Sequence, residues 1–107
     1  MTSFDERGAA FETKYARDAE MDFRVMARRN KLVGLWAAKK LGLTPVEADA
    51  YAATVIAADF EEPGDADVVR KLHADLTAGG FEPTDTEIRA ALAEQLIEAR
   101  RQLTATS

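Results

Sequence analysis

Apolar residues recur at helical spacing in four segments of the chain, over residues 18–41, 45–61, 65–78 and 85–103. Steps of three and four residues between apolar positions predict amphipathic helices. No segment is apolar on all sides, and the connections are short, so each helix needs an antiparallel neighbour. We therefore predict an all-α fold, a four-helix bundle with a flexible N-terminal arm. The expected core positions are Met21, Val25, Leu32, Leu35 and Trp36, then Ala48, Tyr51, Ala52, Val55 and Ile56, then Val68, Val69, Leu72 and Leu76, and finally Ile88, Leu92, Leu96 and Leu103 with Ile97 beside them.

The first break between segments contains residues that typically end one helix and begin the next. Gly42 is expected to adopt the left-handed conformation that ends a helix. Thr44 and Glu47 have the spacing of a capping box, with Pro45 at the first helical position. These residues predict a tight turn into the second helix.

The two later breaks follow the same logic. Pro63 cannot continue a helix, Gly64 turns the chain, and Asp65 is a candidate N-cap for the third helix. Gly79 is expected to end that helix. The fourth helix begins at a second capping box, formed by Thr84 and Glu87.

Residues 1–18 form a separate amphipathic stretch. Phe4, Phe11 and Tyr15 share one helical face, about 90° from the stripe predicted for 18–41, so the bundle is not expected to cover both. Met26 and Val33 lie nearer the aromatic face and are candidates to extend it. We predict a flexible arm over 1–18 that becomes helical on binding, a bundle over 19–104 and a frayed tail over 105–107. The alternative is an arm folded back on the bundle.

The arm is expected to be only marginally stable as a helix on its own. A helix of this length is barely stable alone in water, and Gly8 costs up to about 1 kcal/mol relative to Ala. Large aromatic residues and Arg are the usual anchors of interfaces. The candidate partner-binding residues are Phe4, Arg7, Phe11, Lys14, Tyr15 and Arg17.

Composition narrows the functional classes. The chain has 107 residues, no cysteine and a net charge of −5, which argues against nucleic-acid binding. Residues 1–40 have a net charge of +3 and residues 41–107 one of −8. This difference suits the first half to an acidic or mixed partner surface, the alternative being solvated helices with a random charge imbalance. No signal peptide or membrane-spanning run is recognised, which predicts a cytoplasmic protein that does not insert into a membrane.

The sequence offers no recognisable catalytic site. His73 is the single histidine, and with no cysteine a zinc or histidine-based site lacks ligands. No glycine-rich phosphate loop precedes a helix. We therefore expect a non-enzyme without a metal or cofactor.

Two charge clusters leave alternatives open. The acidic cluster of Glu61, Glu62, Asp65 and Asp67 is suited either to helix capping or to a structural divalent cation. The run 28–31, Arg-Arg-Asn-Lys, favours a solvated or salt-bridged helix face, with docking to an acidic partner or a phosphate role as alternatives.

Specific blocks resemble the zeta subunit family, the inhibitors of alphaproteobacterial ATP synthases. The most specific is Ala27-Arg28-Arg29-Asn30-Lys31-Leu32 leading into Gly34-Leu35-Trp36-Ala37-Ala38. The others are Ala10-Phe11-Glu12, Lys14-Tyr15-Ala16, Asp18, Glu20-Met21, Phe23-Arg24, Ala58-Asp59-Phe60-Glu61-Glu62, Gly64-Asp65, Asp67-Val68, Arg70-Lys71 and Asp75. Gly8 and Ala19 depart from the family, which often has charged residues there.

The resemblance implies a function. Members inhibit ATP hydrolysis when the N-terminal segment enters a catalytic alpha–beta interface near gamma as a helix and blocks rotation in the hydrolytic direction. The partners would be the alpha, beta and gamma subunits of F1, with the monomeric protein associated peripherally with the membrane-bound enzyme. ATP or ADP binding is also discussed for the family, and no motif here places such a site. The alternatives are a nucleotide- or metabolite-sensing bundle and a general helical adaptor.

Overall fold

Four helices account for most of the chain. The computed structural model describes residues 3–60 and 64–105, with side chains for 19–60 and 64–104. The helices are α1 (Ser3–Leu41), α2 (Pro45–Ala58), α3 (Ala66–Ala78) and α4 (Asp85–Ala105). The all-α, four-helix prediction is confirmed. Helix α2 ends before the predicted residue 61, and the arm and the first predicted helix form one continuous element.

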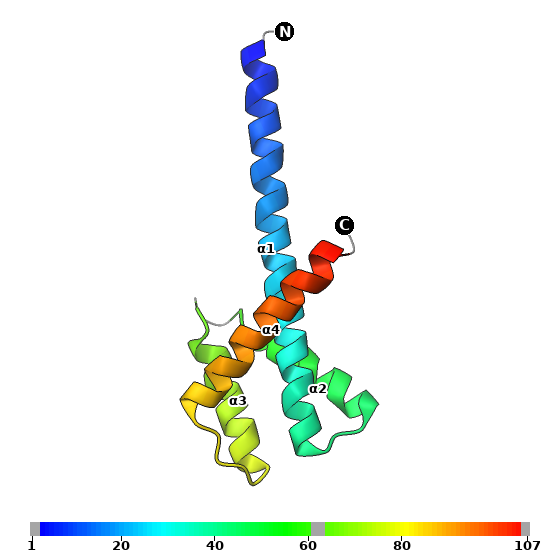
Figure 1. Cartoon of the computed structure of the whole chain (residues 1–107), viewed down its shortest axis with the longest axis vertical. Helices are drawn as coiled ribbons and strands as arrows, with labels where there is room; N and C mark the ends of the chain where they lie inside the picture. The colour runs from blue at the N-terminus through cyan, green and yellow to red at the C-terminus, as the bar shows by residue number, and fades with distance from the viewer. Residues whose placement is uncertain (1–2, 61–63, 106–107) are drawn as a thin grey trace.

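Helix α1 is the axis on which the other helices assemble. Helices α2 and α4 pack along its second half, and α3 lies against α1, α2 and α4. The first half of α1 projects well past the other three helices (Figure 1). The overall extents of 64 × 26 × 20 Å reflect this projection.

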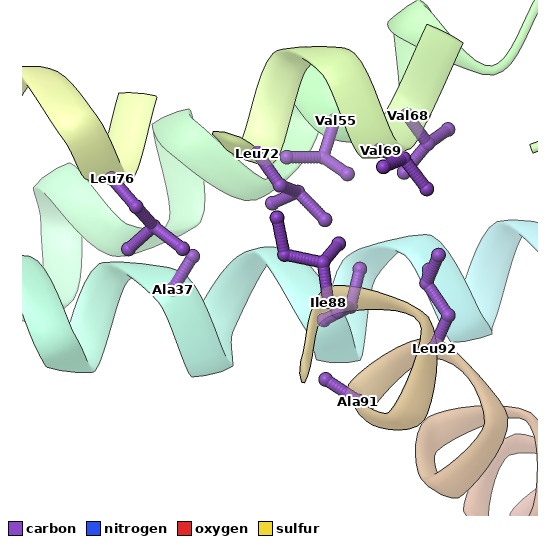
Figure 2. Close-up of a cluster of buried hydrophobic side chains, with 10 residues drawn as sticks. Ala37, Val55, Val68, Val69, Leu72, Leu76, Ile88, Ala91 and Leu92 are labelled. Carbon is purple, nitrogen blue, oxygen red and sulfur yellow. The ribbon is translucent and has the colours of Figure 1, made fainter. Parts of the chain in front are cut away.

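The main core lies where all four helices meet (Figure 2). Val33, Val55, Val68, Leu72 and Ile88 are fully buried there. All four apolar positions predicted for the third segment, at 68, 69, 72 and 76, are buried. In the fourth segment Ile97 is 71% exposed, because it lies on the opposite side of α4 from Ile88 and Leu92.

The buried face of α1 differs from the predicted stripe. Leu32, Leu35 and Trp36 are only half-buried, while Gly34 and Ala37 face the core. A Cβ atom added to Gly34 would lie 2.8 Å from the Cα atom of Ala52. Small residues therefore let α1 and α2 approach closely, and the larger residues pack at the edges of this crossing.

The turn between α1 and α2 matches its prediction. Gly42 has a φ of +73°, and the Leu43 N–H donates to the Ala38 carbonyl at 3.1 Å, which closes the last turn of α1. The capping box is complete, since the Glu47 N–H donates to Thr44 Oγ1 at 3.2 Å and the Thr44 N–H donates to Glu47 Oε1 at 2.9 Å.

The turn after α3 matches its prediction, because α3 ends at Ala78 with Gly79 as its C-cap. Gly80, with a φ of +93°, takes the left-handed conformation in this turn. The Phe81 N–H then donates to the Leu76 carbonyl at 3.0 Å. A Cβ atom added to Gly79 would lie 2.2 Å from Leu41 Cδ2, so the end of the Leu41 side chain would have to move. At the start of α4, Thr84 Oγ1 accepts from the Glu87 N–H at 3.1 Å.

The α2–α3 turn is partly confirmed and partly corrected. Gly64 has a φ of +82°, as its predicted turn requires. Asp65 occupies the N-cap position of α3 but makes no side-chain capping hydrogen bond. Its carboxylate binds Arg29 of α1 instead, at 2.9 Å. Glu61 and Glu62, predicted as part of the acidic cluster, lie outside the described residues.

Candidate partner-binding site

The predicted partner-binding residues all belong to the projecting half of α1. Phe4, Arg7, Phe11, Lys14, Tyr15 and Arg17 fall within Ser3–Leu41, and their side chains lie outside the described residues. The helix continues through Gly8. This half continues the line of the half of α1 that packs in the bundle (Figure 1). Its becoming helical only on binding stays a prediction.

The bundle ends on α1 at a second, smaller apolar cluster. Val25 packs there with Ala99 and Leu103 from the end of α4, and Met21 lies partly buried beside them. Helix α1 has 39 residues and α4 has 21, so at about 1.5 Å per residue they span roughly 58 and 31 Å. The longer helix therefore extends past the end of its partner.

The predicted divergence between the aromatic face of residues 1–18 and the buried face of α1 was wrong. Val33, predicted to extend that face, is fully buried, and Arg29 is only 2% exposed. Phe11 and Arg29 are 18 positions apart, as are Tyr15 and Val33, and that spacing is about five full helical turns. The aromatic face therefore continues the buried face of α1. The projecting half extends beyond the bundle because the neighbouring helices are short, rather than because the two faces diverge.

Buried polar contacts fix α1 to the α2–α3 connection. Arg29 Nη1 lies 2.9 Å from Asp65 Oδ1, and Arg29 Nη2 lies 3.8 Å from Asp59 Oδ1. Arg29 Nε and Nη2 also donate to Oδ1 of the buried Asn30, at 3.1 and 2.8 Å. A buried guanidinium needs such partners to offset its desolvation. The salt-bridged interpretation of the basic run is thus confirmed at Arg29, which is buried in the bundle.

Other polar contacts join neighbouring elements. The Arg28 Nη1 atom donates to Gln102 Oε1 of α4 at 2.7 Å. The Tyr51 hydroxyl donates to Asp75 Oδ2 at 2.7 Å, and burial together with this carboxylate raises the Tyr51 pKa above its usual value. Lys71 pairs with the same Asp75 oxygen at 3.0 Å. The first of these contacts joins α1 to α4, and the Tyr51–Asp75 hydrogen bond joins α2 to α3.

The acidic cluster has partners within the protein. Asp65 is paired with Arg29, and the buried Asp67 accepts the Val68 N–H through Oδ1 at 2.9 Å. Within 19–60 and 64–104, where side chains are described, no group of three or more His, Cys, Asp or Glu residues is placed to hold a metal ion. No helix within 3–60 and 64–105 is both long and apolar enough to cross a membrane.

A family model described as ATPase inhibitor subunit zeta matches residues 1–102. The chain belongs to this family. The match includes the projecting half of α1 and all four helices, so the zeta identification made from the Arg-Arg-Asn-Lys-Leu block is confirmed. A zeta member is an inhibitor subunit of an ATPase, which makes this chain a regulatory protein of the ATP synthase system.

A solved structure, described as the solution NMR structure of a protein, is 45% identical to this zeta chain. The similarity covers 81% of this chain and 99% of the other, with a TM-score of 0.72. No curated protein matches the chain at a significant level.

One structural residue of this zeta chain was missed by sequence reasoning. Arg29 was assigned to a charged helix face, yet it is the buried anchor of α1. A signal was present, because Arg29 and Val33 lie four residues apart and Asp59 and Asp65 flank a helix break. Together they indicated a basic residue on the core side of α1 and acids at the turn it contacts.

Proposed function

We propose that this chain inhibits ATP hydrolysis by F1, with its N-terminal segment inserting as a helix at a catalytic alpha–beta interface near gamma. There it blocks rotation in the hydrolytic direction. The observation that carries the proposal is the projection of α1 past the end of the bundle as an unbroken helix. A stiff helix occupying a gap between subunits opposes their movement without any chemistry.

The arm residues supply the expected contacts. Phe4, Phe11 and Tyr15 would insert into apolar pockets, and Arg7, Lys14 and Arg17 would pair with acidic groups of the interface. The bundle would then hold the lower end of the arm in a fixed position. Arg29 and the Gly34 crossing hold α1 against α2, so a force on the arm is transmitted to the whole domain.

Truncation tests the proposal. Purified chain should lower ATP hydrolysis by cognate F1, and in energised vesicles that hold the whole ATP synthase it should lower hydrolysis more than synthesis. A variant lacking residues 1–18 should have no effect in either assay. Circular dichroism checks that the truncated protein keeps its remaining helices. If the folded truncated chain inhibits as well as the full chain, the arm is not the inhibitory element and the proposal fails.

A further inference from the structure

A second exposed apolar surface lies on the bundle at the base of the projecting helix. Phe23 of α1 and Phe60, just after α2, are 56% and 65% exposed. Their ring centroids are 5.8 Å apart. Two large aromatic side chains paired in solvent across an interhelical junction are unusual in a small soluble domain, where exposed apolar patches often mark interaction sites.

The aromatic pair borders a hollow with an apolar floor and a basic wall. Phe23, Ala27, Ile56 and Leu103 supply the apolar lining, and Arg24, Arg28 and Lys31 supply the charge. We call this set of seven residues the basic groove. A smaller hollow that shares Phe23, Ala27 and Ile56 continues it towards Phe60.

The positive charge of the groove is not neutralised by the described part of the chain. Among those residues no carboxylate pairs with Arg24 or Lys31, and Arg28 binds the neutral amide of Gln102. Asp59 is near the aromatic end, but it is paired with Arg29. An acidic ligand would therefore find three cations beside an apolar floor.

The shape of the groove favours a protein side chain as its occupant. Its volume of about 270 Å³ is below the range of about 300–1,000 Å³ that is usual for small-molecule sites. A concave surface also suits an inserted side chain better than a flat lipid surface. The groove is formed largely by α1, a few residues after Asp18, so a partner seated along the arm would meet it next.

We infer that the basic groove docks an acidic protein segment that carries a large apolar side chain. The inference rests on the proposed function, because the segment would belong to the same ATP synthase that receives the arm. Docking here would add a second contact and keep the arm close to its interface between insertions, which increases its effective concentration there.

The test measures binding of the fluorescently labelled full chain to purified cognate F1. Arg24→Glu/Lys31→Glu should weaken binding about tenfold at low salt and reduce its salt dependence, because both changes reverse rim charges. Lys39→Glu/Lys40→Glu, the same charge change in the last turn of α1, should change binding less than about twofold. Phe60→Ser tests the apolar end, with a similar tenfold loss expected.

Three results would overturn the inference. The first is unchanged binding by both the Arg24/Lys31 variant and the Phe60 variant, with circular dichroism showing that they are folded. The second is an equal loss in the Lys39/Lys40 control, which would show an effect of net charge alone. The third is binding of wild-type chain to phosphatidylglycerol vesicles that depends on Arg24 and Lys31, which would assign the groove to a membrane surface.

A full-length arm variant separates this inference from the proposed function. If Phe11→Ala/Tyr15→Ala abolishes inhibition while the groove variants inhibit and bind normally, only the groove inference fails. If the arm variant inhibits like wild type, the proposed function fails, whatever the groove variants do.

Discussion

The close crossing of α1 and α2 at Gly34 gives a quantitative prediction. In Gly34→Ala the new Cβ atom would lie 2.8 Å from Ala52 Cα, 3.2 Å from Ala52 Cβ and 3.3 Å from Val55 Cγ2. Since the nearest atom is backbone, the helices must move apart. Overpacking of this kind costs about 1–3 kcal/mol, and the higher helix propensity of Ala offsets up to about 1 kcal/mol of it.

The net expectation is a loss of about 1 kcal/mol, which lowers Tm by about 4–8 °C in a domain of this size. Thermal unfolding followed by circular dichroism measures it. Gly8→Ala is the matched control, because it makes the same change in the same helix, in the half that projects past the bundle, and it should leave Tm unchanged or higher. A Gly34→Ala protein as stable as wild type would refute the close crossing of α1 and α2.

Three further predictions follow from the arm, the buried arginine and a surface ion pair. Gly8→Ala should make inhibition of cognate F1 up to about fivefold tighter, because it removes about 1 kcal/mol of helix-ordering cost; a titration showing weaker inhibition would contradict this. Arg29→Met should lower the free energy of unfolding in urea by about 2 kcal/mol. This loss is smaller than the loss from breaking a fully buried ion pair, because Asp65 is partly exposed. Unchanged stability would show that the ion pair of Arg29 does not stabilise the fold. Hydrogen bonds from Arg101 and Gln102 lower the pKa of Glu98 from 4.5 to about 2. A lowered carboxyl pKa stabilises the folded state above the unfolded value, so the wild-type advantage over Glu98→Gln should be full above pH 4.5 and vanish as the pH falls towards 2; an NMR titration giving Glu98 an ordinary pKa would refute it.

The helix boundaries were readable from the sequence because they depend on local chemistry. Thr44 with Glu47 and the glycine at Gly42 act through their own neighbours, so they are recognised without knowing the tertiary structure. The end of α3 at Gly79 was readable in the same way. The neighbouring Gly80, which takes the left-handed conformation, was not singled out from the sequence.

The buried face of α1 was not readable in the same way. Sequence reasoning gives weight to large apolar side chains, whereas close helix packing selected Gly34 and Ala37, and ion pairing brought Arg29 inside. The same bias displaced the predicted stripe and led to the wrong argument about the aromatic face. The contacts of Phe11 and Tyr15 depend on the surface of a second protein, which the sequence of this chain does not contain.

The most direct test of the account is where the arm goes in the inhibited complex. A photo-crosslinking phenylalanine analogue at position 11 should join the chain to the catalytic beta subunit and to its alpha neighbour when hydrolysis is inhibited. The same analogue at position 97, an exposed site on α4, should give neither product. Crosslinks from position 97 but none from position 11 would show that the bundle, and not the projecting half of α1, occupies the interface.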